Sequence, residues 1–169
     1  MNAAADRARL FLALWPGAAV RGELAAWRDG WTWPKTASPV RTERLHVTLH
    51  FLGDVASERL PELVDGLRVP FTPFTLDFGR NALWPRGIAV LEPDPVPPAL
   101  LALHASLARA MAPLALAPDE RLYRPHVTLA RRAGNARIIN DGPPLAWHID
   151  RYALVRSDQG YTVLQDYYP

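Results

Sequence analysis

The sequence has 169 residues, of which 49% are hydrophobic and 21% charged, so one compact domain with a buried core is expected over residues 1–169. This composition excludes wholesale disorder, and the absence of cysteine excludes a disulfide scaffold, thiolate zinc sites and cysteine nucleophiles. The net charge of +2 does not by itself require a nucleic-acid partner.

The first half of the chain begins with an apolar segment, residues 9–15, that reads as a strand and is closed by a Pro-Gly pair. That run is too short for a signal peptide or a membrane span, and we expect a cytoplasmic protein. The spacing of Val20, Leu24 and Trp27 predicts a helix that ends at Gly30. A loop is expected over residues 31–39.

The middle of the chain alternates strand and helix signals. Residues 45–52 are rich in strand-forming types and are followed by Gly53, and a helix with one apolar face begins at Ser57. Residues 71–78 and 88–91 look like a strand pair, followed by a proline-rich connector.

In the last part of the chain, residues 100–111 form a helix whose core-facing stripe comprises Leu100, Leu103, Leu107 and Met111. Three strands are then expected at residues 125–131, 147–155 and 161–167. This mixed order favours an α+β class, and no glycine-rich phosphate loop is present.

One motif occurs twice. Leu45-His46-Val47-Thr48-Leu49 recurs as Pro125-His126-Val127-Thr128-Leu129, which suggests a duplicated unit with one copy of HVTL in each half of the chain. Because side chains alternate across a strand, each histidine shares a face with its threonine while the valine and leucine point to the core. A single His-x-Thr is usually a half-exposed surface feature, but two copies in strand-like context favour a shared site.

A metal site is not supported by the residues near these motifs. They include no adjacent carboxylate, thiolate or His-Glu-x-x-His pattern. His46 and His50 would lie roughly 13 Å apart on a regular strand, too far to share one ion.

Two histidines and two hydroxyls facing each other suit phosphodiester cleavage. The entering oxygen must lose a proton and the leaving oxygen must gain one, and histidine does both near neutral pH because its ordinary pKa is about 6.5. The hydroxyls of Thr48 and Thr128 would donate to the phosphate oxygens. A strained cyclic phosphate is a suitable substrate for a site without a metal.

The segments HVTLHFLG and PHVTLAR resemble the signature of the 2H phosphoesterases, and the chain is similar in particular to the bacterial RNA 2',3'-cyclic phosphodiesterases, also called 2'-5' RNA ligases. The resemblance extends from RLFLALWP near the start to LVRSDQGYTVLQDY near the end. It implies a bilobed, duplicated α+β fold, with two antiparallel sheets flanked by helices around a central basic cleft. It also implies metal-independent hydrolysis of RNA or nucleotide 2',3'-cyclic phosphates to 2'-phosphates, without cofactors. The same site would join RNA ends through a 2'-5' linkage in the reverse reaction, and a monomer is the default expectation.

Carried over to this chain, the resemblance makes His46 the acid that protonates the leaving 3'-oxygen and His126 the base that activates water. Thr48 and Thr128 would bind the phosphate, and Arg131 would add a cationic contact. On a regular strand Arg131 would point into the core, so the strand either bulges or ends near Ala130 or Arg131 is not a phosphate ligand.

Strand parity places His50 on the cleft face beside His46, either stacked on a base or, as we expect, at the rim. His104 and His148 are expected to be surface histidines, and Phe51, Trp84 and Tyr123 to pack in the core or at the rim rather than on nucleobases. The alternative function is a non-catalytic module that binds RNA ends in the same groove.

Overall fold

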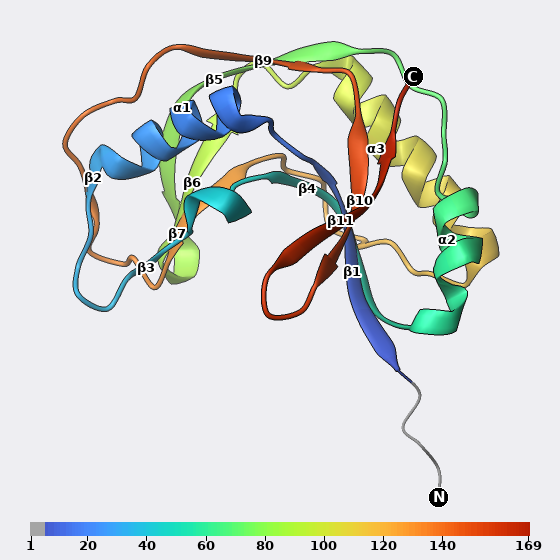
Figure 1. Cartoon of the computed structure of the whole chain (residues 1–169). Helices are drawn as coiled ribbons and strands as arrows, with labels where there is room; N and C mark the ends of the chain where they lie inside the picture. The colour runs from blue at the N-terminus through green and yellow to red at the C-terminus, as the bar shows by residue number, and fades with distance from the viewer. Residues whose placement is uncertain (1–5) are drawn as a thin grey trace, which may run out of the picture.

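The computed structural model describes residues 6–169, which form one large curled antiparallel sheet, one small sheet and peripheral helices (Figure 1). The first half of the large sheet contains β1 (Arg7–Leu14), β4 (Val47–Ala56), β10 (Tyr152–Ser157) and β11 (Tyr161–Tyr167). The second half contains β5 (Phe74–Trp84), β6 (Ile88–Pro93), β7 (Val127–Arg131) and β9 (Leu145–Ile149). The short strand β3 (Ser38–Pro39) pairs with β7, and β2 (Trp31–Thr32) and β8 (Arg137–Ile138) form the small sheet.

The strand order β11-β10-β1-β4-β7-β6-β5-β9 places the two motif strands at the centre of the large sheet. β4 and β7 are joined by a single antiparallel pair, Val47 with Val127. Each motif strand is flanked on its other side by an equivalent neighbour, β1 for β4 and β6 for β7. The two predicted sheets are therefore halves of one curled sheet that meet at the duplicated motif.

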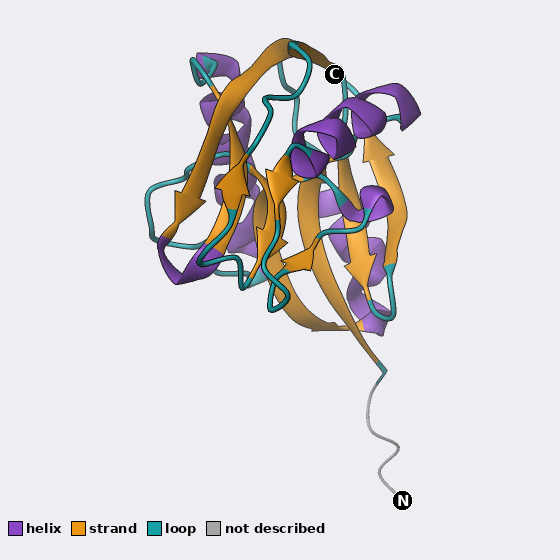
Figure 2. Cartoon of the chain, turned by 90° about the vertical axis from the view of Figure 1, so that its left-hand side faces the viewer, coloured by secondary structure: helices purple, strands orange, loops and turns teal. Residues whose placement is uncertain are grey.

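Among the described residues, three α-helices cover the sheet: α1 (Ala18–Asp29), α2 (Leu60–Gly66) and α3 (Pro98–Met111). The helix that follows β1 contacts β7 and β9, and the helix that follows β6 contacts β4, so α1 and α3 each pack on the opposite half of the sheet. The predicted stripe of α3 is confirmed, since Leu100, Leu103, Leu107 and Met111 are all buried. In both views the strands occupy the middle of the molecule and the helices its periphery (Figure 1, Figure 2).

Several boundaries differ from the sequence prediction. The expected strand over residues 147–155 is two strands, because Ile149 pairs with β5 at one end of the large sheet while Tyr152 pairs with β11 at the other. The loop predicted over residues 31–39 contains β2 and β3. Gly53 does not end β4; its positive φ of 77° lies next to an irregularity in the β1–β4 register, and the strand continues to Ala56.

The predicted α+β class is confirmed by this mixed architecture. Within residues 6–169, no helix combines the length and the apolar character needed to cross a membrane. The assignment of residues 1–169 to a single domain stays a prediction.

Candidate active site

The two HVTL segments meet where the halves of the sheet are joined. His46 and His126 immediately precede β4 and β7, and the Val47–Val127 pair lies directly beside them. The valine and leucine of each motif are buried, whereas the histidine and threonine are partly exposed. The predicted alternation therefore holds within both motifs, and both polar pairs lie on the open side of the junction.

Each histidine ring is oriented by the carbonyl oxygen two residues earlier. His46 Nδ1 donates to the oxygen of Arg44 at 2.6 Å, and His126 Nδ1 donates to the oxygen of Arg124 at 2.8 Å. With Nδ1 as the donor, Nε2 of a neutral ring is the free base. His46 Nε2 accepts from the Thr48 hydroxyl at 2.9 Å, so Nε2 is the atom of each ring that can exchange a proton with a substrate.

The same combination of arginine and aromatic ring surrounds both histidines. The guanidinium of Arg44 lies 5.5 Å from the ring of Tyr161, which contacts His46 at 5.5 Å between ring centres. The guanidinium of Arg124 lies 4.4 Å from the ring of Trp84, which contacts His126 at 4.4 Å. Sequence reasoning missed this role of the arginines, although an arginine stands two residues before both histidines.

The electrostatic environments of the two rings differ. Burial lowers the pKa of His46 to about 4, and the nearby charges of His126, Arg21 and Arg131 act in the same direction. Phe11 and Trp15, at 5.0 and 5.6 Å between ring centres, supply much of its apolar surroundings. His46 is therefore neutral at neutral pH in the ligand-free protein.

Burial also lowers the pKa of His126, but two contacts oppose the shift. The carbonyl of Arg124 accepts its Nδ1 proton, and the carboxylate of Glu92 provides a negative charge nearby. Arg131 and Arg124 add positive charge that lowers the pKa further. An anionic phosphate placed between the rings would raise the pKa of both histidines.

A β-bulge follows the threonine in each motif strand. Leu49 has no partner between the pairs Thr48–Ala13 and His50–Leu12. Leu129 has none between Thr128–Val90 and Ala130–Ala89. Each extra residue reverses the alternation of the side chains that follow it.

The bulge at Leu129 decides the position of Arg131. Ala130 is buried, and Arg131 is exposed on the side of Thr128 instead of pointing into the core. Its positive charge lowers the pKa of both His46 and His126. Of the two alternatives that the sequence left open for Arg131, the structure therefore shows the one in which the strand bulges near Ala130.

The bulge at Leu49 overturns the prediction for His50. His50 does not share the face of His46: only 4% of it is exposed, and its Nε2 donates to the carbonyl of His104 at 2.8 Å. The equivalent of Arg131 in the first motif is Phe51, which is 67% exposed. Strand parity failed here because sequence alone did not reveal the extra residue.

His104 is likewise not an ordinary surface histidine. Its ring stacks on His50 at 4.0 Å and on Tyr123 at 3.9 Å, and the Tyr123 hydroxyl donates to the Thr48 carbonyl at 2.9 Å. This stack connects α3 to the backbone of the first motif. His148, by contrast, is exposed, as predicted.

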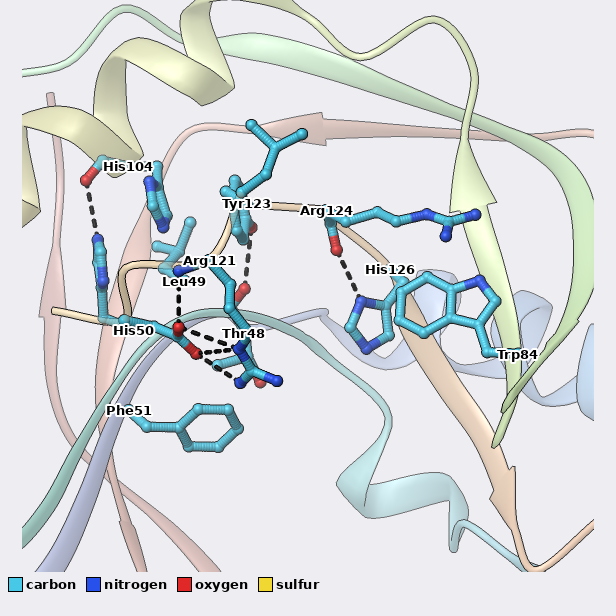
Figure 3. A pocket seen from close by; sticks show the side chains of 12 residues that line it. Thr48, Leu49, His50, Phe51, Trp84, His104, Arg121, Tyr123, Arg124 and His126 are labelled. Carbon is cyan, nitrogen blue, oxygen red and sulfur yellow. Dashed lines mark hydrogen bonds and ion pairs between the residues drawn. The ribbon is translucent and has the colours of Figure 1, made fainter. Parts of the chain in front are cut away.

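A cavity of about 230 Å³ extends from His126 along this stack (Figure 3). His46, Thr128 and Arg131 are not among the residues that line it. Thr48, His126 and Trp84 line one part, and His50, His104 and Tyr123 line another. Two exposed apolar side chains, Phe51 and Leu122, also border it. Trp84 and Tyr123 pack against His126 and His104, so of the three candidate aromatic residues Phe51 has the most exposed ring.

Comparison with known proteins agrees with this geometry. The family model described as the 2'-5' RNA ligase superfamily matches residues 16–161. The chain belongs to the 2'-5' RNA ligase superfamily. This confirms the resemblance seen in the sequence. The chain is also 33% identical, over 132 residues, to the RNA 2',3'-cyclic phosphodiesterase of Escherichia coli K12, covering 76% of this chain and 74% of that protein.

Solved structures are also similar to this protein over nearly the whole chain. E. coli LigT complexed with 3'-AMP matches with a TM-score of 0.84 and 27% identity, covering 96% of this chain and 98% of LigT. A protein of Thermus thermophilus matches with a TM-score of 0.79 and 26% identity, covering 95% and 97% of the two chains. These similarities confirm the bilobed 2H phosphoesterase fold.

Proposed function

We propose that this protein hydrolyses 2',3'-cyclic phosphates of RNA ends or nucleotides to 2'-phosphates, with His46 and His126 as the acid and base. The observation that carries the proposal is the pair of histidines beside one junction, each with Nδ1 bonded to a backbone carbonyl, which leaves Nε2 as the atom that can exchange a proton. The E. coli relative named as an RNA 2',3'-cyclic phosphodiesterase supports the substrate class.

In the proposed reaction, water attacks phosphorus while its proton passes to Nε2 of His126. The bond between phosphorus and the 3'-oxygen breaks, and Nε2–H of His46 protonates that oxygen, leaving a 2'-phosphate. Each proton transfer contributes typically about 10²–10⁴ in rate. Because the pKa of His46 is about 4 in the ligand-free protein, the negative charge of the bound phosphate is needed to keep a proton on that ring.

Thr48, Thr128 and Arg131 are proposed to bind the phosphate oxygens. The proposal is supported by both hydroxyls lying on the same side of their strands as the histidines, and by the bulge at Leu129, after which Arg131 is exposed instead of buried. The Thr48 hydroxyl, which donates to His46 Nε2 in the ligand-free protein, would turn to a phosphate oxygen and free Nε2 for the leaving group.

The test is a short RNA that ends in a 2',3'-cyclic phosphate, incubated with the protein in EDTA, with the product identified by mass and by resistance to a 3'-phosphatase. We expect a 2'-phosphate that is lost in His46→Ala and His126→Ala but not in the control His148→Ala, whose exposed side chain lies on β9. Binding without turnover would favour the non-catalytic RNA-end module. A requirement for a divalent metal would contradict the mechanism.

A second substrate separates the roles of the two histidines. Sulfur in place of the bridging 3'-oxygen leaves without a proton, so it makes the acid dispensable. We expect this substrate to restore turnover in His46→Ala and not in His126→Ala. The opposite pattern would exchange the roles, and restoration in neither variant would contradict acid catalysis by a histidine.

The same site would join RNA ends through a 2'-5' bond when the reverse reaction is favoured by substrate concentration. We further propose that the protein acts in the cytoplasm as a monomer. A mass close to 18.8 kDa in solution would support the monomer, and a larger mass would contradict it.

A further inference from the structure

The duplicated halves differ in the residue that follows the last leucine paired with each motif strand. Leu14 pairs with Val47 and Leu91 pairs with Val127, each as the last pair on that side of its motif strand. The next residues are Trp15, which adjoins His46, and Glu92, which adjoins His126. Both are followed by proline, so Leu-Trp-Pro in one half corresponds to Leu-Glu-Pro in the other. The same place in the fold therefore holds an aromatic ring beside one histidine and a carboxylate beside the other.

Glu92 is a buried acid held by two arginines. It is 6% exposed, and its Oε1 accepts from Arg124 Nε at 2.6 Å, while Arg80 Nε lies 3.7 Å from Oε2. Both arginine side chains are more than half exposed, so the acid is the buried partner of this network. A buried carboxylate is costly unless its charge is compensated, and these contacts compensate it.

Arg124 transmits the position of Glu92 to His126 by two routes. Its carbonyl oxygen accepts the Nδ1 proton of His126, and its guanidinium lies on the ring of Trp84, which packs against His126. The bond to Glu92 fixes the guanidinium at one end of this chain of contacts. Figure 3 shows the Trp84 ring beside the ring of His126, with the Arg124 side chain above both in this view.

We propose that Glu92 is a positioning residue that orients His126 through Arg124 and stabilises its protonated form, so that the two histidines are not equivalent. The proposal rests on the proposed function, in which His126 takes the proton of water. The imidazolium formed in that step gains a negative charge nearby, whereas His46 at the equivalent place meets the ring of Trp15. An acid that orients a catalytic histidine and stabilises its cation is a recurrent arrangement in hydrolases.

The charges around His126 favour this assignment. Arg124, two residues before His126, and Arg131 on β7 contribute positive charge that lowers the pKa of His126, while Arg80 on β5 pairs with Glu92. Glu92 is the acid whose charge opposes them, and it raises the pKa of His126. Removal of that charge is therefore expected to make His126 a weaker base.

The decisive variant is Glu92→Gln, because a glutamine oxygen still accepts from Arg124 while the charge is lost. The pKa of His126 is measured by NMR titration of the ligand-free protein, with the ring signals assigned from their loss in His126→Ala. We expect this pKa to fall by about one pH unit. With the cyclic phosphate substrate, kcat/KM should fall roughly tenfold, and the limb of the pH profile that reports His126 should move to lower pH.

Two matched variants serve as controls. Glu92→Asp retains the charge and should retain most of the pKa of His126, and Arg80→Gln should leave the pH profile within about half a unit of the wild type. An unchanged pKa of His126 in folded Glu92→Gln would overturn the proposal. If Glu92→Gln does not fold, the wild type decides, because a pKa of His126 no higher than that of His46 would also overturn it.

The NMR titration requires no substrate, so the two proposals can fail separately. A shifted pKa without hydrolysis of the cyclic phosphate would refute the proposed function and support the action of Glu92 on His126. Hydrolysis with an unshifted pKa of His126 would support the proposed function and refute the action of Glu92 on His126.

Discussion

The burial of His46 predicts that acid destabilises this protein within a defined pH window. The pKa of His46 is about 4 in the folded protein, against an ordinary value of about 6.5 in the unfolded chain. Because the folded pKa is lowered, the contribution of His46 to stability is complete above pH 6.5 and is lost as the pH falls toward 4. The full contribution is about 3 kcal/mol, and about 2 kcal/mol of it is lost between pH 7.5 and pH 5.0.

The assay is urea unfolding at pH 7.5 and pH 5.0, followed by tryptophan fluorescence. With a slope of roughly 2 kcal/mol per molar urea, the contribution of His46 corresponds to a shift of about 1 M in the midpoint. Burial also lowers the pKa of His50, His104 and His126, so the total loss in the wild type should be larger.

The comparison that isolates this contribution is His46→Gln, in which the pH-dependent loss of stability should be smaller than in the wild type by about 2 kcal/mol. His148→Gln changes an exposed histidine on β9 and serves as the control, which should lose as much stability between pH 7.5 and pH 5.0 as the wild type. An equal loss in His46→Gln and the wild type would refute the conclusion that His46 is buried in its neutral form.

Three further outcomes are expected. Arg131→Gln should raise KM for a cyclic phosphate by about tenfold, because charge-assisted hydrogen bonds contribute roughly 1.5 kcal/mol or more. Steady-state kinetics at constant ionic strength would test this, with Arg132→Gln as the control that should leave KM unchanged. The plot of kcat/KM against pH should be a bell centred below pH 6.5, because the pKa of both catalytic histidines is lowered in the ligand-free protein. The plot of kcat should lie at higher pH, because bound phosphate raises the pKa of both histidines, and coincident plots would contradict this. Tyr123→Phe removes the hydroxyl that donates to the Thr48 carbonyl and should lower the free energy of unfolding by about 1 kcal/mol; an unchanged urea midpoint would show that this bond contributes nothing.

Elements set by interactions between neighbouring residues were predicted from sequence, whereas elements set by pairing between distant residues were not. The helix over Val20, Leu24 and Trp27 ends as predicted, with the Gly30 amide donating to Ala26 and Trp27 carbonyls, because periodicity and a terminal glycine are local signals. The division of residues 147–155 into β9 and β10 was not predictable in the same way. Continuous apolar content does not reveal that Ile149 and Tyr152 pair at opposite ends of the large sheet.

The catalytic candidates were accessible from sequence because the motif is repeated and because alternation is a property of any strand. His46, Thr48, His126 and Thr128 could therefore be proposed from the two HVTL segments alone, along with the burial of their valines and leucines. A repeat supplies its own comparison within one chain, and this is why a short pattern predicted so much of the site.

What lies beyond each threonine was decided by the tertiary structure. The bulges at Leu49 and Leu129 exist only in relation to the partner strands β1 and β6, so the orientations of His50 and Arg131 depend on pairings between residues distant in the chain. The same holds for Glu92, whose charge acts on His126 because β6 pairs with β7. The sequence by itself determined which groups are available for proton transfer, and the pairing of the strands determined their environment.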